Sequence, residues 1–339
     1  MELQKQFVEI AELIKDARNR TLTIVNRQLI ELYLEIGKYI SQKIEDNSWG
    51  KSIVQSLSDF LKEEYPDLKG FSSQNMWRMK QFYECYKDNE KLSTPLREIS
   101  WSNNLHILSK TKSIEEREFY IKLCIQEKYS ARELERQIDS GYFERYMLSD
   151  GKAPAAITEL YPEAKKIFKD SYVFEFLNLP DKHLENDLQK ALIHNLKKFI
   201  LELGKDFIFI GEEYKLQVGK SDFYIDLLFY HRELSCLVAF ELKIDNFKPE
   251  YLGKLNFYLE ALDRDIKKPH ENPSVGIILC KSKDDDIVEY ALSRNLSPTL
   301  VADYTTKLID KKLLQRKLHE LFELSTEQIE AIKEGDGTL

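Results

Sequence analysis

A chain of 339 residues with 42% hydrophobic and 32% charged residues is long enough for two folded domains and too apolar for wholesale disorder. Its net charge of −8 argues against a protein that coats nucleic acid non-specifically. Any contact with nucleic acid must therefore use a local patch or a metal ion. The four cysteines are far apart, and no apolar run is long enough to cross a bilayer. With charged rather than apolar first residues, we expect a cytoplasmic protein.

The first 148 residues predict an all-α domain, because apolar residues recur three and four apart and no segment alternates like a strand. Ser72 or Ser73 is the expected N-cap of one helix. The helices predicted in this domain cover residues 7–40, 52–64, a segment that begins after the N-cap, 115–127 and 131–142.

Small and turn-forming residues at 149–156 predict a linker to a second domain at 157–325. Segments rich in branched and aromatic residues predict strands at 207–210, 223–230, 236–243, 275–280 and near 299–302. Helical patterns occur at 157–169, 182–203, 249–263, 284–293 and 308–322. This order of elements predicts a mixed sheet with helices on its faces.

Charged residues interrupt two of these strands, where a buried strand should have none. Asp226 is the only carboxylate in one apolar strand, and Glu241 and Lys243 end the next. The intervening segment is short enough for an antiparallel hairpin. If Tyr230 pairs with Leu237, Asp226 lies opposite Glu241, with Cβ atoms roughly 4.5–5.5 Å apart.

Two carboxylates this close together repel each other unless a cation lies between them. Oxygen ligands favour a hard ion, Mg²⁺ or Mn²⁺, and Lys243 can orient a water or neutralise charge on a phosphate. A metal, a water and a lysine suffice to hydrolyse a phosphodiester. The alternative is a structural ion pair at a strand end. No Walker, GxSxG or zinc-ligand spacing is present, so an ATP-driven enzyme, acyl transfer and zinc are not expected.

The spacing of Asp226 and Glu241-Leu242-Lys243 resembles the metal site of PD-(D/E)XK nucleases. The longer segments FYIDLLFYHRELSCLVAFELK, FKPEYLGKLNFYLEALD and ENPSVGIILCKSKDDDIVEYAL resemble the C-terminal nuclease domain of the YhcG family. The segments ELYLEIGKYI, WGKSIVQSLSDFL, GFSSQNMWRMKQFYECY and ISWSNNLHILSKTK resemble its helical domain. The resemblance runs from about residue 8 to 305. It implies an α+β protein of two domains: an all-α helical domain, then an α/β restriction-endonuclease-like domain with a central mixed sheet.

The resemblance implies that Asp226 and Glu241 bind the metal, with the Leu242 carbonyl as a further ligand, and that Lys243 is catalytic. The superfamily often adds an acidic residue from the preceding helix. Glu185 is our candidate for this acidic residue, and Asp187 is a second candidate. Alternatively, Glu185 is an ordinary glutamate on the solvent-facing side of its helix.

This chain departs from the family pattern at two places. Lys254 stands where the family has glutamine; it either faces a phosphate or water or is a surface residue. Glu212-Glu213 stands where the family has an arginine-glutamine pair, and these acids bring extra negative charge toward the site.

The helical domain offers a candidate substrate-binding element in Gln74, Asn75 and Arg78, at the start of a helix. Amide and basic side chains at a helix N-terminus are the types that contact base edges in a major groove. A helix, a turn and this second helix resemble a helix-turn-helix arrangement. The alternative is an ordinary bundle helix with a polar outer face.

Taken together, these features predict Mg²⁺- or Mn²⁺-dependent hydrolysis of phosphodiester bonds, with DNA as the expected substrate. The sequence does not choose between endonuclease and exonuclease cleavage. The rivals are a ribonuclease with the same site and a catalytically silent nucleic-acid-binding or adaptor protein. The helical domain is also a candidate for homo-oligomer formation.

Overall fold

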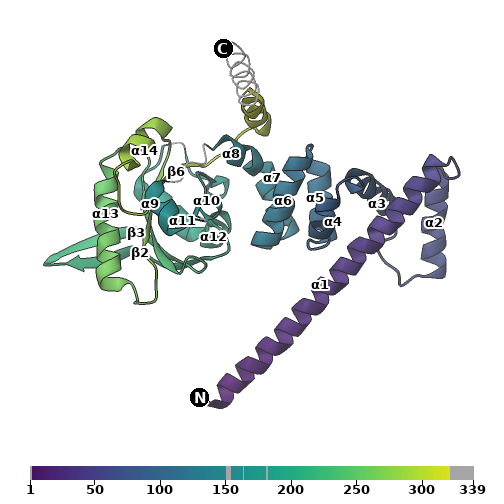
Figure 1. Ribbon diagram of the computed structural model, residues 1–339, viewed down its shortest axis with the longest axis horizontal. Helices are drawn as coiled ribbons and strands as arrows, with labels where there is room; N and C mark the ends of the chain where they lie inside the picture. Colours follow the sequence, from purple (N-terminus) through teal and green to yellow (C-terminus); the bar gives the residue numbers. More distant parts are fainter. Residues whose placement is uncertain (1, 150–153, 163, 181, 321–339) are drawn as a thin grey trace, which may run out of the picture. The chain divides into compact units, whose positions relative to one another are not determined.

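The computed structural model describes residues 2–149, 154–162, 164–180 and 182–320 (Figure 1). The chain divides into two compact units, Met1–Ile138 and Asp139–Leu339. This division falls before the end of the predicted helical domain at residue 148. Of the predicted linker 149–156, residues 150–153 lie outside the described residues, as do residues 321–325 of the predicted second domain.

The first unit is all-α, as predicted. Its helices are α1 (Glu2–Glu45), α2 (Lys51–Glu64), α3 (Ser73–Tyr86), α4 (Glu90–Leu96), α5 (Trp101–Lys110), α6 (Ile114–Glu127) and α7 (Ala131–Asp139). Ser72 is the N-cap of α3, and its side chain accepts a hydrogen bond from the Asn75 backbone N–H. We did not predict α4 and α5.

The helix predicted at 131–142 is interrupted. Gly141 has φ +63°, a left-handed conformation that suits glycine, and it separates α7 from α8 (Tyr142–Leu148). Among the described helices, none combines the length and the apolar content that a membrane span needs.

The second unit is built on one six-stranded sheet with the strand order β1-β6-β5-β4-β3-β2. Its strands are β1 (Ser171–Val173), β2 (Phe207–Val218), β3 (Ser221–His231), β4 (Cys236–Leu242), β5 (Val275–Cys280) and β6 (Thr299–Thr305). β2, β3 and β4 pair antiparallel, whereas β4, β5, β6 and β1 pair parallel. The sheet is therefore mixed, as predicted.

Helices cover both faces of this sheet (Figure 1). One face packs against α9 (Ala155–Leu160), α10 (Ala164–Ile167), α11 (Glu185–His194) and α12 (Leu196–Leu203). The other packs against α13 (Tyr251–Ala261) and α14 (Asp285–Leu292). Side chains alternate along a strand, so Leu227 and Leu228 of β3 belong to different cores.

Several predicted elements differ from the structure in detail. The helix predicted at 157–169 is two short helices, α9 and α10, and the one at 182–203 breaks at Asn195 into α11 and α12. β2 extends well beyond residue 210, and β1 was not predicted because its three residues are too few to show a period. A closing helix is described over residues 311–320.

Gly276 in β5 allows α13 to lie close to the sheet. A Cβ atom at this position would lie 2.7 Å from Leu255 Cδ2, and Leu255 is fully buried. Gly253, on α13 itself, has no atom within 4 Å of the corresponding position. The approach of α13 therefore depends on a missing side chain in β5.

We predict that Gly276→Ala lowers the free energy of unfolding by about 1–3 kcal/mol, because an extra methyl group overpacks the core. Gly253→Ala is the matched control and should leave stability unchanged or raise it, because alanine favours a helix. Chemical denaturation of both variants measures the difference. Equal stabilities would show that α13 does not need this gap.

Candidate active site

The pairing of β3 with β4 brings Asp226 next to Glu241. Tyr230 pairs with Leu237, as predicted, and Leu227 pairs with Phe240. The same register extended by one residue sets Asp226 opposite Glu241. The Leu242 backbone N–H donates a 2.7 Å hydrogen bond to Asp226 Oδ2, which holds this carboxylate at the end of β4.

Both carboxylates lie in a poorly solvated place. Glu241 is 0% exposed, and its Oε2 atom has no hydrogen-bond partner. Burial and the charge of Glu241 raise the pKa of Asp226 to about 6. An unpartnered, buried carboxylate oxygen is costly, so this arrangement would be stabilised by a cation.

Two lysines partly neutralise the pair. Lys243 Nζ lies 2.9 Å from Glu241 Oε1, and Lys254 Nζ lies 2.6 Å from the same oxygen. Burial opposes the charge of each lysine, but the neighbouring carboxylates outweigh it and raise the pKa of both Lys243 and Lys254. Both lysines bind Oε1, so Oε2 is the oxygen of Glu241 that is left to bind another cation.

Lys243 also contacts two other predicted metal ligands. Its Nζ donates to the Leu242 carbonyl at 2.9 Å and lies 3.2 Å from Glu185 Oε2. The carboxylates of Glu185, Asp226 and Glu241, with the two lysines, have a formal net charge of −1. A divalent ion would reverse this sign and make the site attractive to a phosphodiester anion.

The donor set fits a hard divalent cation: two carboxylates, one of them with an unpartnered oxygen, and a backbone carbonyl. Within the described ranges, no three His, Cys, Asp or Glu side chains are arranged to enclose an ion. Glu185 is bound to Lys243 and its side chain is 47% exposed, so its part in binding a metal stays a prediction.

Helix α11 contributes a residue that sequence analysis missed. Gln189 Nε2 donates a 3.0 Å hydrogen bond to the Asp226 backbone carbonyl and so fixes β3 beside the helix. Gln189 lies one turn after Glu185, on the same side of the helix. Asp187 has a different task, because its Oδ2 accepts from the Leu184 backbone N–H and caps the helix.

Glu212 and Glu213 lie in β2 opposite this part of β3, after a β-bulge at Ile210. Glu212 pairs with Leu227 and Tyr214 with Ile225, so Glu213 lies opposite Asp226, and its φ is +44°. Both glutamates are exposed. A positive φ is uncommon for a residue other than glycine, and the sequence shows no turn-forming signal at Glu213.

Comparison with known proteins finds a matching domain family for each part of the chain. Residues 165–319 match the YhcG PDDEXK nuclease domain, and residues 9–145 match the DUF1016 N-terminal domain. The chain is 32% identical over 349 residues to "Putative nuclease YhcG" of Escherichia coli (strain K12). The alignment covers 91% of this chain and 92% of that protein. The chain belongs to the YhcG family. No solved structure matches it significantly.

The family's helical domain carries the predicted substrate-binding residues on α3. Gln74 and Arg78 are exposed and one turn apart. Asn75 is occupied within the domain: its Nδ2 donates to the Gly70 carbonyl at 2.6 Å, and its Oδ1 accepts from Trp101 Nε1 at 3.0 Å. Asn75 therefore positions the turn before α3, and Gln74 and Arg78 are the side chains available to a ligand.

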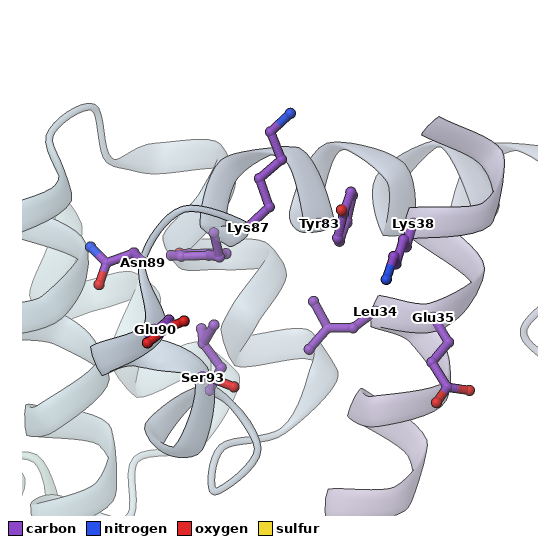
Figure 2. Close-up of a pocket in the computed structure, with 10 residues that line it drawn as sticks. Leu34, Glu35, Lys38, Tyr83, Lys87, Asn89, Glu90 and Ser93 are labelled. Carbon is purple, nitrogen blue, oxygen red and sulfur yellow. The ribbon is translucent and has the colours of Figure 1, made fainter. Parts of the chain in front are cut away.

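A pocket of about 220 Å³ lies among α1, α3 and α4 of the same domain (Figure 2). Its lining combines Lys38 and Lys87 with Glu35, Glu90 and the ring of Tyr83. None of the predicted site residues lines this pocket.

The raised pKa of Asp226 predicts a pH dependence of stability in EDTA. The folded state favours the protonated carboxyl, so this contribution is complete below about pH 4 and is lost as the pH rises through about 6. Asp226→Asn is neutral throughout and should melt a few degrees above the wild type at pH 8, with a much smaller difference at pH 4.

Thermal melts of both proteins across this range measure the effect. Glu233→Gln, which removes an exposed carboxylate from the hairpin turn, should melt like the wild type at every pH. A constant difference between Asp226→Asn and wild type from pH 4 to pH 8 would contradict the charge conflict at Asp226.

Proposed function

We propose that this protein is a metal-dependent nuclease that hydrolyses phosphodiester bonds, with DNA as the proposed substrate and RNA as the alternative. The observation that carries the proposal is the unpartnered Oε2 of buried Glu241, next to Asp226 and two lysines. A structural ion pair would leave no buried oxygen unsatisfied. Membership of the YhcG family, whose nuclease domain contains these residues, supports the same activity.

Asp226, Glu241 and the Leu242 carbonyl would hold Mg²⁺ or Mn²⁺, with Glu185 as a further candidate. When bound, the ion supplies a water of lowered pKa and positive charge for the phosphate. Asp226 is already held by the Leu242 N–H and Glu241 by the sheet, so neither carboxylate needs to move far to bind it.

Lys243 is the proposed catalytic side chain. Its raised pKa keeps it protonated, so it donates hydrogen bonds and does not act as a general base. It lies at the end of β4 with its charge 2.9 Å from Glu241 Oε1. From this position, it would orient the attacking water or stabilise charge that develops on the phosphate.

Nucleic acid is the proposed partner, and the exposed Gln74 and Arg78 of α3 are candidates to contact it. The family relationship favours a nuclease. RNA cleavage is the alternative activity. A silent nucleic-acid-binding protein is the alternative function, and the intact set of Asp226, Glu241 and Lys243 argues against it.

Substitution of each site residue tests the proposed activity. Asp226→Asn, Glu241→Gln and Lys243→Ala should each lower cleavage by at least about 10²-fold, the scale of losing one electrostatic catalytic group. The assay compares DNA and RNA of matched sequence with Mg²⁺ and with Mn²⁺. Glu233→Gln is the control and should cleave like the wild type.

Full activity of Asp226→Asn would refute the assignment of the site. Binding without cleavage by the wild type, with every divalent ion tried, would favour the adaptor function. Cleavage of RNA alone would establish the ribonuclease alternative with the same residues.

Lys254 is proposed to compete with the metal for Glu241 when no nucleic acid is bound, and to contact a phosphate when it is. We predict that Lys254→Gln binds Mn²⁺ up to about fivefold more tightly, the scale of one partly exposed charge pair, and binds nucleic acid more weakly. Electron paramagnetic resonance of free Mn²⁺ measures the first effect and fluorescence anisotropy the second.

The matched control is Lys248→Gln, which removes an exposed lysine that pairs with Asp245 instead of Glu241. It should leave Mn²⁺ affinity unchanged. Identical behaviour of Lys254→Gln and Lys248→Gln would make Lys254 a surface residue, the alternative that its sequence position allowed.

A further inference from the structure

The first half of α1 exposes apolar side chains that cover no core of the described residues. Helix α1 is continuous over 44 residues (Figure 1), a length typical of a helix that pairs with another helix. Seven large apolar side chains near its start are each between 54% and 66% exposed: Phe7, Ile10, Leu13, Ile14, Leu22, Ile24 and Val25.

Four of these seven residues, Phe7, Ile10, Ile14 and Ile24, follow a heptad pattern. The spacing alternates between three and four residues, which places one stripe along the helix as in the a and d positions of a coiled coil. The stripe consists of Phe7, Ile10, Ile14, Ala17, Thr21 and Ile24.

This stripe is distinct from the surface with which α1 packs on its own domain. The later half of α1 buries Ile30, Tyr33 and Ile40, and Gly37 lies against the Met79 carbonyl of α3. At about 100° per residue, the two sets of side chains point roughly 150° apart. The domain core therefore cannot extend along α1 to cover the stripe.

The charge of the segment argues for a protein surface as its partner. Residues 2–29 carry four acidic and five basic side chains, far from the lysine- and arginine-rich face that binds anionic lipid or nucleic acid. Six of the exposed side chains lie on the stripe or directly beside it and offer on the order of 600 Å², at about 100 Å² each: Phe7, Ile10, Leu13, Ile14, Ile24 and Val25. A stable interface buries about 800 Å² per partner, so pairing of this segment supplies about three quarters of that area.

The flanking residues are compatible with a second copy of this chain in parallel. In that arrangement, a residue on one edge of the stripe faces the residue five positions later on the other edge of the second helix. Arg18, Arg20 and Arg27 would then lie opposite Leu13, Val25 and Leu32 of the second copy, so no two arginines oppose each other. Their alkyl stems would cover the edges of the apolar stripe.

We propose that residues 7–25 of α1 pair with the same segment of a second copy, as a parallel two-stranded coiled coil that makes the protein a dimer. This inference does not depend on the nuclease site. It identifies the stripe as the part of the helical domain through which two chains associate.

Replacement of the stripe tests the dimer. Ile14→Gln with Ile24→Gln keeps good helix formers but removes two central apolar contacts. The matched control, Lys15→Gln with Thr23→Gln, alters the opposite side of the same turns. Light scattering at several concentrations should give twice 40.0 kDa for the wild type and the control, and 40.0 kDa for the stripe variant.

A wild type that stays at 40.0 kDa, or a stripe variant that remains a dimer, would overturn the proposal. So would a monomer that sediments with phosphatidylcholine–phosphatidylserine vesicles, because the stripe would then bind lipid.

A cysteine in the stripe tests the parallel direction independently of stability. Ile24→Cys should form a disulfide-linked dimer on mild oxidation, because residue 24 of each copy meets its counterpart in a parallel coil. In an antiparallel coil it would lie near residue 7 of the other copy. Thr23→Cys, on the opposite side, should cross-link far less, and equal cross-linking of the two would contradict the parallel arrangement.

Discussion

The antiparallel pairing of β3 with β4 is the constraint on which the candidate site depends. It sets Asp226 against Glu241 at the edge of two buried strands, where neither carboxylate is well solvated. The residues around this pair either neutralise it or hold it in place. Lys243 and Lys254 reach the same oxygen of Glu241, and Gln189 binds the backbone of Asp226.

This arrangement is costly for a structure that needs only to fold. Burial raises the pKa of Asp226, Glu241 retains an unpartnered oxygen, and Glu213 adopts a positive φ opposite Asp226 in the neighbouring strand β2. Such local conflicts concentrate at functional sites, where a ligand relieves them. A divalent cation would relieve the first two at once, which is why the metal-free geometry supports a metal-dependent function.

The β3–β4 register could be predicted from the sequence because a short hairpin and a two-residue period leave few alternatives. The two carboxylates and Lys243 follow directly from that register. The environment of Lys254 could not be predicted, because its contact with Glu241 depends on the distance of α13 from the sheet, which Gly276 allows. Gln189 and the positive φ of Glu213 were missed for a related reason: each involves backbone geometry and carries no signal in its side-chain type. For Asn75, the sequence indicated a polar helix start, but it could not show that Trp101 and Gly70 already use the amide.

The most direct test of the central claim is calorimetric titration of Mg²⁺ into the wild type and Glu241→Gln, with Glu233→Gln as the control, alone and with a non-cleavable duplex. The account predicts that the wild type and the control bind the ion, with or without the duplex, and that Glu241→Gln does not. Absence of binding by the wild type in both conditions, or equal binding by Glu241→Gln, would contradict it and leave Asp226, Glu241 and the lysines as a structural ion-pair network.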